Sequence, residues 1–400
     1  MFRVSQFMKE IASPTPVAPK REPAGPVVIW NLIRRCNLNC KHCYSISTDR
    51  DFPGELTTEE IYKVMDDLKQ FGVSALILSG GEPLLRSDIF KISRRAKEMG
   101  FYVGLSTNGT LIGERIIAAV AAVGYDYVGV SLDGIGNTHD MFRRRDGAYD
   151  LSLNAVRLCR QRGIKVGLRF TMTMDNAREL PDMIKLAEDE GVDKFYLSHL
   201  NYAGRGNTNR ADDAQYATTR WAMNTLFNTC WDYVERGLEK EFVTGNNDAD
   251  GVFLLRWVSR HFPDKTKHIA AKLVQWGGNS SGVNVANIDN LGHVHPDTMW
   301  WHYDLGCVRD RPFSEIWTDV SDPIMAGLKC RPRRVKGRCG ACTYLDICGG
   351  NTRVRAMQLS GDAWAEDPGC YLTDAEIGVA PGGERLIVSP YRKRRRAIVG

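Results

Sequence analysis

Along the first half of the chain, short apolar runs rich in β-branched residues alternate with amphipathic stretches of helical length. A short apolar run between polar stretches indicates a buried strand, and apolar residues repeating every three or four positions indicate a helix. The sequence predicts strands at 27–33, 75–79, 102–106, 127–131, 165–173 and 194–200, with helices at 58–70, 87–99, 111–122, 150–162 and 178–190. Such alternation is typical of a parallel sheet with right-handed crossovers. Six units favour an α/β partial barrel, (β/α)6, that is open on one side.

The remaining segments differ from this pattern and suggest further divisions of the chain. A long helix is expected at 211–240, irregular or short-helical structure at 244–280, and a hairpin at 283–297. The Cys- and Gly-rich stretch at 330–370 has little periodicity, so it is expected to need a metal to fold. The predicted divisions are an extended N-terminal arm (1–26), the partial barrel (27–210), a helical connector (211–282), a cysteine-rich domain (283–375) and a basic tail (376–400).

Charge and hydropathy exclude several classes of protein. The net charge is +5, and the run Arg392–Arg396 alone supplies five positive charges. No aromatic-interleaved basic surface accompanies it, so we expect a solvated tail and no nucleic-acid partner. The apolar run at 116–123 is far shorter than the roughly 20 residues of a membrane span. The first 20 residues lack a signal-peptide core, so we expect a cytoplasmic protein with no membrane partner.

The cysteines fall into two groups. The chain has 11 of them, an unusual number for a reducing compartment unless they bind metal. Cys36, Cys40 and Cys43 form a CxxxCxxC motif directly after the first strand. Three thiolates so close can hold three irons of a [4Fe–4S] cluster and leave the fourth iron open to a bidentate amino acid. The alternative is a zinc site that recruits His42 or a distant residue.

Polar and glycine-rich motifs follow the next three strands, where barrel enzymes place their active sites. Gly80, Gly81, Glu82 and Pro83 follow the second strand; Ser106 and Asn108 follow the third; Ser131, Asp133 and then the basic run beginning at Arg143 follow the fourth. Glycines allow close approach to a ligand, and a carboxylate accepts hydrogen bonds from an ammonium group. Hydroxyl and amide groups suit ribose, and a guanidinium can clamp a carboxylate.

In this combination of motifs the chain resembles the radical S-adenosylmethionine (SAM) superfamily over about residues 27–200. The resemblance implies a cluster on Cys36, Cys40 and Cys43, with Gly80–Pro83 binding the SAM amine. It implies a SAM pocket completed by Ser106, Asn108, Ser131, Asp133 and Arg143, with Tyr44 near the adenine. The implied chemistry is one-electron reduction of SAM to methionine and a 5′-deoxyadenosyl radical that abstracts hydrogen from the substrate.

The second cysteine group resembles the SPASM extension of this superfamily. Its four thiols are Cys339, Cys342, Cys348 and Cys370. The family's next cysteine is replaced by Thr352, and its Pro-Cys hairpin end by Pro296-Asp297. The resemblance therefore implies one auxiliary [4Fe–4S] cluster, two clusters in all. Cys330 could replace Cys370 as a ligand, and a zinc ribbon or unliganded core cysteines are the alternatives.

A closer resemblance concerns the substrate. Residues 25–47, 51–57 and 76–86 are similar to the NirJ-type enzymes of heme d1 biosynthesis and, less closely, to Ahb-type heme synthases. The first remove two propionate side chains from didecarboxysiroheme, and the second decarboxylate coproheme propionates to vinyls. The resemblance implies an iron tetrapyrrole substrate and a low-potential electron donor of flavodoxin or ferredoxin type. His199 and His295 are candidates to bind the substrate iron or donate a proton. Peptide modification and a non-catalytic cluster protein are the rival hypotheses.

Overall fold

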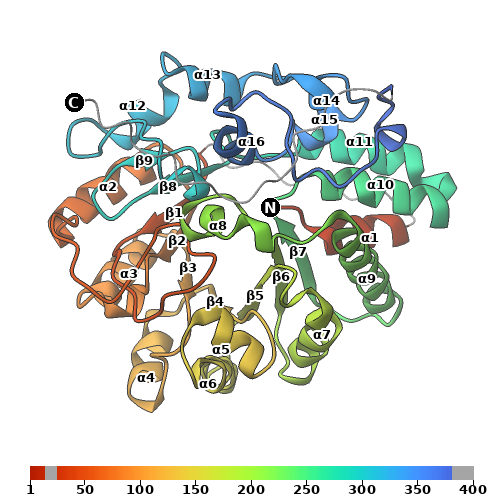
Figure 1. Cartoon of the computed structure of the whole chain (residues 1–400). Coiled ribbons are helices and arrows are strands. Elements are labelled where there is room, and N and C mark those ends of the chain that lie inside the picture. The colour runs from red at the N-terminus through yellow and green to blue at the C-terminus, as the bar shows by residue number, and fades with distance from the viewer. Residues whose placement is uncertain (14–24, 381–400) are drawn as a thin grey trace, which may run out of the picture.

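One continuous sheet organises the chain in a computed structural model that describes residues 1–13 and 25–380 (Figure 1). Its strand order is β7-β6-β5-β4-β3-β2-β1-β8-β9, and every neighbouring pair is parallel except β8 and β9. The strands are β1 (Val27–Asn31), β2 (Ala75–Ser79), β3 (Tyr102–Thr107), β4 (Tyr127–Ser131), β5 (Val166–Met172), β6 (Lys194–His199), β7 (Glu241–Gly245), β8 (Val285–Ile288) and β9 (Val294–His295). All six predicted strands are present.

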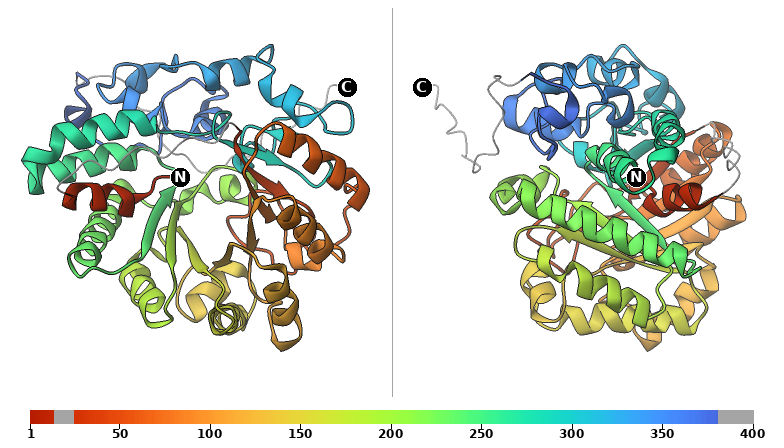
Figure 2. Two further views of the ribbon diagram at one scale, coloured as in Figure 1. Left: turned by 180° about the vertical axis from the view of Figure 1, so that it is seen from behind. Right: turned by 90° about the vertical axis from the view of Figure 1, so that its right-hand side faces the viewer.

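Helices between the strands cover the outer face of the curved sheet (Figures 1 and 2). They are α2 (Thr58–Gln70), α3 (Ile89–Glu98), α4 (Glu114–Val123), α5 (Asn137–Arg143), α6 (Ala148–Gln161), α7 (Leu180–Asp189) and α9 (Tyr216–Glu235). Helix α8 (Gly204–Thr208) lies instead against the loop after β1, where Arg205 donates to the Cys40 carbonyl. Local sequence sets the ends of the covering helices. Thr57 and Glu60 form a reciprocal capping box at the start of α2, and Gly124, at φ 67°, ends α4 in the left-handed conformation that glycine adopts without strain.

The two faces of each strand differ in chemistry. Residues on the outer face, such as Leu168 and Phe170, are fully buried beneath the helices. On the inner face stand glycines and small hydroxyl residues at the carboxyl ends: Ser79, Ser106, Ser131, Thr171 and Ser198. Because side chains alternate along a strand, this pattern directs apolar bulk outward and leaves the inner wall polar.

The sheet extends beyond the six predicted strands. Strand β7 begins between the helix predicted at 211–240 and the segment 244–280, which is expected to be irregular or short-helical. That segment contains two regular helices, α10 (Ala249–His261) and α11 (Thr266–Trp276). The predicted connector therefore supplies a seventh parallel strand, which pairs with β6. Strand β8, placed in the cysteine-rich domain by the sequence, pairs in parallel with β1.

The expected extended arm is wrong for the first part of residues 1–26. Val4–Ala12 forms helix α1, whose Val4, Met8 and Ile11 side chains are buried. The backbone of Phe2 pairs with Thr244 at the end of β7, with N···O distances of 2.8 Å in both directions. The helix is amphipathic and packs against α9 and β7, so burial of its apolar side chains stabilises it.

The C-terminal segment forms a second layer on one side of the barrel (Figures 1 and 2). Its helices are α12 (Phe313–Thr318), α13 (Pro323–Lys329), α14 (Gly337–Gly340), α15 (Leu345–Cys348) and α16 (Arg353–Ser360). It contacts the residues that follow β6 and β7: Arg355 donates to the Leu200 carbonyl, and Thr352 to the Asn246 carbonyl. This layer therefore covers the carboxyl ends of the strands. Of the predicted basic tail, residues 381–400 lie outside the described part.

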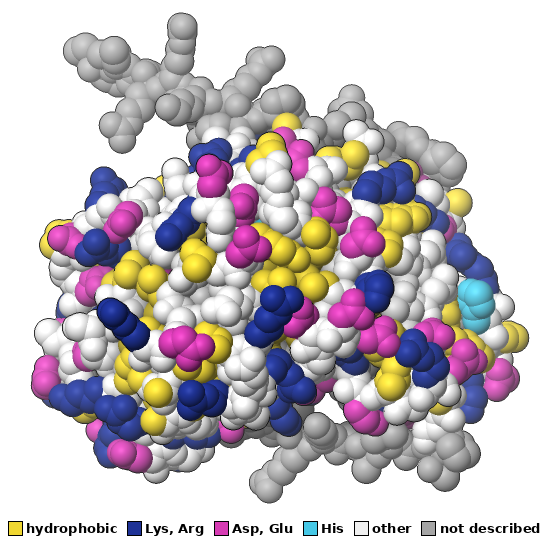
Figure 3. Space-filling view, turned by 90° about the horizontal axis from the view of Figure 1, so that it is seen from below, with side chains coloured by type: hydrophobic (Ala, Val, Ile, Leu, Met, Phe, Trp, Pro, Cys, Tyr) yellow, Lys and Arg dark blue, Asp and Glu magenta, His cyan; other side chains and the backbone are white. Residues whose placement is uncertain are grey.

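The face shown in Figure 3 carries Lys and Arg interspersed with Asp and Glu, with hydrophobic side chains in small groups between them. In the described ranges, none of the helices combines the length and apolarity that crossing a bilayer requires.

Candidate functional site

The loop after β1 brings three thiols together at the carboxyl end of the sheet. Each sulfur of Cys36, Cys40 and Cys43 faces a hydrogen-bond donor. The Leu38 N–H lies 3.4 Å from Cys36 Sγ, the Ser47 N–H lies 3.4 Å from Cys43 Sγ, and Arg143 Nη1 lies 3.5 Å from Cys40 Sγ. Such donors stabilise negative charge on sulfur, so the loop is arranged for thiolates.

Burial opposes ionisation of the same thiols when no metal is bound. Desolvation raises the pKa of Cys36 and of Cys40, and neighbouring thiols add to the effect for both. Thiolates so placed are stabilised by coordination to a metal, which requires that protons be released. All three thiols are free of disulfides. The donor set fits three ligands of an iron–sulfur cluster.

The two glycines after β2 bring this loop close to the cysteine segment. A Cβ on Gly80 would lie 2.4 Å from the Ile33 carbonyl oxygen, and one on Gly81 would lie 2.3 Å from that of Arg35. The Gly81 N–H donates to Ile33 O at 2.7 Å. Only glycine permits this approach, so the motif locks the β2 loop onto the backbone that precedes Cys36.

Glu82 is the acidic centre of the site. It is fully buried, and its carboxylate accepts hydrogen bonds from the Asn108 N–H at 2.8 Å and the Thr107 hydroxyl at 2.7 Å. Pro83 begins a 3-10 turn directly after it. Burial raises the pKa of Glu82 to about 7 even though these hydrogen bonds act in the opposite direction. The carboxylate thus links the ends of β2 and β3 and can bind a cationic or hydrogen-bond-donating partner.

Arg143 and Asp133 form a buried ion pair beside the cluster loop, which is the loop that carries Cys36, Cys40 and Cys43. One terminal nitrogen of Arg143 pairs with Asp133, and the other reaches Cys40. Asp133 also accepts a hydrogen bond from the Thr171 N–H at 2.6 Å. The structure therefore places Arg143 on the thiol of Cys40. Asp133, predicted for the SAM pocket, faces Arg143 and the backbone of β5.

The remaining predicted SAM residues line the same rim. Asn108 Nδ2 lies 2.9 Å from Asn37 Oδ1 and 3.9 Å from Cys36 Sγ. The Tyr44 hydroxyl accepts from Asn31 Nδ2 at 2.7 Å, and its ring meets Trp301 edge-on with a centroid distance of 6.0 Å. Ser106 accepts from Arg169, which is level with Ser131 in the sheet register.

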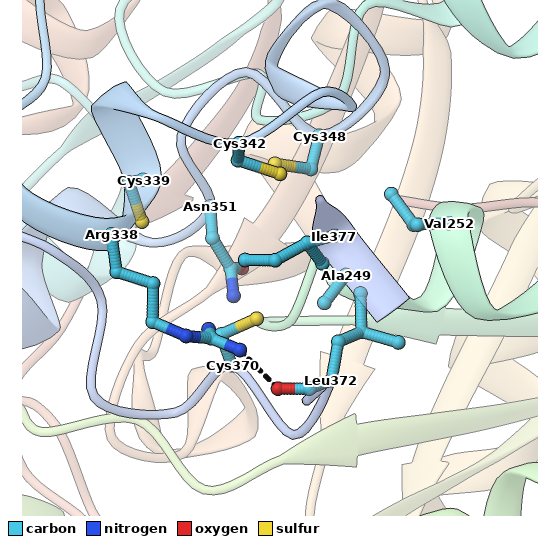
Figure 4. Close-up of a pocket in the computed structure, with 10 residues that line it drawn as sticks. All are labelled: Ala249, Val252, Arg338, Cys339, Cys342, Cys348, Asn351, Cys370, Leu372 and Ile377. Carbon is cyan, nitrogen blue, oxygen red and sulfur yellow. Dashed lines mark hydrogen bonds between the residues drawn. The ribbon is translucent and has the colours of Figure 1, made fainter. Parts of the chain in front are cut away.

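The second cysteine group surrounds one pocket (Figure 4). Cys339, Cys342, Cys348 and Cys370 all line it, although Cys370 follows the others by 22 residues or more. The other lining residues are Ala249, Val252, Arg338, Asn351, Leu372 and Ile377. Cys330 is not among them, and its thiol lies 3.5 Å from the Pro332 carbonyl oxygen. Burial raises the pKa of Cys339 to about 11. Four thiols in a mostly apolar pocket fit the ligands of a second cluster.

The two candidate histidines have different surroundings. His199 is buried, and its Nε2 lies 3.0 Å from Asp250 Oδ2, while Tyr371 donates to the other oxygen of that carboxylate. His295 Nδ1 donates to the Tyr303 carbonyl at 2.6 Å, and its ring stacks on Trp301 at 5.9 Å. Through Trp301, His295 is connected to Tyr44 and the cluster loop, whereas His199 belongs to a contact between the barrel and the C-terminal layer.

Two residues near the site were not predicted in their observed surroundings. His42, predicted only as an alternative zinc ligand, packs against Phe142 with a ring-centroid distance of 4.8 Å and lines a pocket with Lys41 and Asn209. Its position between two ligand cysteines was the available signal. Arg169 lies inside the barrel, and an arginine within the apolar run KVGLRFTMT was visible in the sequence.

Three neighbouring thiols, a buried acidic residue at the end of the next strand and a partial barrel beneath them are the features of an enzyme that holds an amino-acid cosubstrate on an iron–sulfur cluster. Residues 30–187 match the family model of the Radical SAM superfamily. The chain is 55% identical to the pre-heme d1 synthase of Dinoroseobacter shibae, over 98% of this chain and 97% of that protein. It therefore belongs to the radical SAM superfamily, and this membership implies SAM and a [4Fe–4S] cluster.

Two further comparisons extend this result. The chain is 44% identical to the Fe-coproporphyrin III synthase of Methanosarcina barkeri, over 88% of this chain and 89% of that protein. The crystal structure of Streptococcus suis SuiB bound to S-adenosylmethionine superposes with a TM-score of 0.67 at 16% identity, covering 87% of this chain and 78% of SuiB. The structural likeness shows a shared fold that includes the C-terminal layer.

Proposed function

We propose that this chain is a radical SAM enzyme of heme d1 biosynthesis that removes propionate side chains from didecarboxysiroheme. The observation that carries the proposal is the 55% identity to a pre-heme d1 synthase across almost the whole of both chains. Identity to the Fe-coproporphyrin III synthase is lower and covers less of the chain. Both names refer to iron tetrapyrrole metabolism or its products, so a tetrapyrrole substrate is favoured over a peptide.

In this proposal Cys36, Cys40 and Cys43 hold the [4Fe–4S] cluster, which together with bound SAM supplies a 5′-deoxyadenosyl radical. Glu82 accepts a hydrogen bond from the SAM amino group. Arg143 acts on the cluster through Cys40, where its positive charge balances the negative charge of the thiolate. The hydroxyl and amide groups of Ser106, Asn108 and Ser131 face the ribose, and Tyr44 packs near the adenine.

The second pocket would hold an auxiliary [4Fe–4S] cluster on Cys339, Cys342, Cys348 and Cys370. All four ligands would then be protein thiolates, which leaves no open iron and suits a role in electron transfer. We propose a flavodoxin- or ferredoxin-type donor and a cytoplasmic location. Of the two candidate histidines we favour His295 as the proton donor to substrate, because its ring is connected to the cluster loop through Trp301.

The test is product analysis after anaerobic reconstitution. The enzyme is incubated with SAM and reductant, and with didecarboxysiroheme or coproheme in parallel, and the products are weighed by mass spectrometry. Loss of whole propionate units from didecarboxysiroheme is expected. Loss of carbon dioxide alone from coproheme would establish heme synthase chemistry instead. A product with the mass of Fe-coproporphyrin III would reject the proposal in favour of the second relative's activity. The Cys36, Cys40 and Cys43 triple alanine variant is the control and should form no 5′-deoxyadenosine.

A further inference from the structure

Arg169 reaches across the inside of the barrel. It stands in the middle of β5, and its guanidinium donates to the Ser106 hydroxyl on β3, two strands away. The side chain passes over Gly129 on β4, where an added Cβ would lie 3.1 Å from Arg169 Cδ. On its other side, the guanidinium carbon lies 5.6 Å from the centre of the Tyr196 ring. Glycine on β4 therefore makes room for an arginine along the inner wall.

This cation differs from its neighbours in having no carboxylate partner. Lys194, also on the inner wall, lies 3.3 Å from a carboxylate oxygen of Glu241, and Arg143 pairs with Asp133. Within residues 1–13 and 25–380, no Asp or Glu oxygen lies within ion-pair distance of Arg169. Arg169 interacts electrostatically with Asp133 from beyond ion-pair distance, but Arg143 already pairs with that carboxylate. In the described part of the chain, the charge of Arg169 therefore has no direct ion-pair partner of its own.

The inner wall around Arg169 is open to a ligand. Ser106, Ser131, Thr171 and Arg169 itself are half-buried, whereas outer-face residues of the same strands, such as Leu105, are fully buried. The Thr171 hydroxyl, on the same face of β5 and not assigned to SAM, can donate to the same anion. The planar fork of arginine matches a carboxylate through two parallel hydrogen bonds. The site therefore has the chemistry of a carboxylate receptor.

We propose that Arg169 binds a side-chain carboxylate of the iron tetrapyrrole and so fixes how the macrocycle sits over the barrel. This inference rests on the proposed function. SAM also has a carboxylate, but the polar groups already close to the cluster thiols are Glu82, Asn108 and Arg143. In the described residues Arg169 makes no hydrogen bond to any of these three or to the cysteines. It meets the proposed SAM pocket only at Ser106, and its other neighbour is the Tyr196 ring. The substrate therefore supplies the carboxylate that completes this site.

Binding measurements with matched ligands test the assignment. Reconstituted wild type, Arg169→Gln and Arg169→Lys are titrated with didecarboxysiroheme and with its methyl ester, following the absorbance of the macrocycle. We expect Arg169→Gln to bind the free acid about 10- to 100-fold more weakly and the ester as tightly as wild type does. Arg169→Lys should lie between them, because it keeps the charge without the fork. Arg178→Gln, which removes an exposed arginine stacked on Trp221 outside the barrel, should match wild type.

A second readout separates the two sources of carboxylate. The electron paramagnetic resonance (EPR) spectrum of the reduced cluster should change on addition of SAM in Arg169→Gln as it does in wild type. Unchanged binding of the free acid in both Arg169 variants would overturn the proposal. Loss of the SAM-dependent spectral change with retained tetrapyrrole binding would also overturn it and assign the site to SAM. If wild type binds the acid through Arg169 but does not convert it, the proposed function fails and the carboxylate assignment stands.

Discussion

Arg143 donates from Nη1 to Cys40 Sγ across 3.5 Å while its second terminal nitrogen pairs with Asp133. Asp133 lies two residues after the end of β4 and is fully buried, and Arg143 ends α5. One side chain thus joins the cluster loop, a barrel strand and a helix. Because the aspartate is held by the backbone of β5 as well, the guanidinium has little freedom, and the position of Cys40 is set by the barrel.

Replacing this arginine should destabilise the protein strongly. Arg143→Met leaves the Asp133 carboxylate buried without its cation, which typically costs about 3–5 kcal/mol. Arg157→Met is the matched control, since its ion pair with Glu190 lies on the surface and is worth about 0–1 kcal/mol. Urea titrations of the two variants measure the difference. Equal unfolding midpoints would show that the Arg143–Asp133 pair contributes no more than an exposed one.

SAM binding should depend on pH through Glu82. Burial raises the pKa of this carboxyl to about 7, whereas an unfolded glutamate has a pKa of about 4.3. The stability that Glu82 contributes is therefore fully present below pH 4 and is lost as the pH rises through 7. The N–H groups of the SAM amine donate to the carboxylate form of Glu82, so affinity for SAM should increase between about pH 6 and 8.

Glu82→Gln should bind SAM more weakly and lose most of this pH dependence, because the amide does not titrate. The measurement is the SAM-dependent change in the cluster's EPR spectrum as a function of SAM concentration at several pH values. Glu188→Gln, on the surface of α7, is the control and should behave as wild type does. A Glu82→Gln profile as steep as that of wild type would assign the pH dependence to another group.

The central strands of the barrel could be predicted from the sequence, but the elements at its edges could not. Strands such as β2 and β5 are apolar runs that stand out from their surroundings, and both are found where expected. Strand β7 is five residues long and begins with Glu241, so its sequence has no pattern that separates it from a loop. Its strand conformation comes from pairing with β6 and Phe2. Helix α1 was not predicted, because the prolines that begin at Pro14 favour an extended chain and hide the short helical segment before them.

Within the site, ligand types could be predicted better than roles. The members of each cysteine group lie together, as predicted. In the first group the cysteines are close in sequence, and in the second the glycine-rich segment brings Cys370 back to the other three. The partner of Asp133 depended on where α5 places Arg143, which spacing alone does not specify. Arg169 was not predicted as a site residue, because its importance depends on the lack of a carboxylate partner. Only the folded barrel shows which residues surround it.

The assignment of the auxiliary ligands predicts different iron contents for two cysteine variants. Wild type should bind about eight irons per chain after anaerobic reconstitution, four for each cluster. Cys370→Ala removes a thiol that lines the second pocket and should reduce this to roughly four or five. Cys330→Ala should retain the wild-type content, because that thiol faces the Pro332 carbonyl outside the pocket. The reverse pattern would make Cys330 the fourth ligand, and about four irons in wild type would remove the auxiliary cluster altogether.

The surroundings of the two histidines predict opposite phenotypes. His199 shares Asp250 with Tyr371 in a buried network, so His199→Gln should lower the free energy of unfolding by about 1–3 kcal/mol and leave the turnover of folded enzyme unchanged. If His295 donates a proton to substrate, His295→Gln should slow product formation at least about 100-fold while 5′-deoxyadenosine is still formed. Turnover per reconstituted cluster and urea unfolding of both variants provide the comparison. A slow His199→Gln beside a fully active His295→Gln would reverse the assignment, and it would move the proton donor from the cluster side of the barrel to its contact with the C-terminal layer.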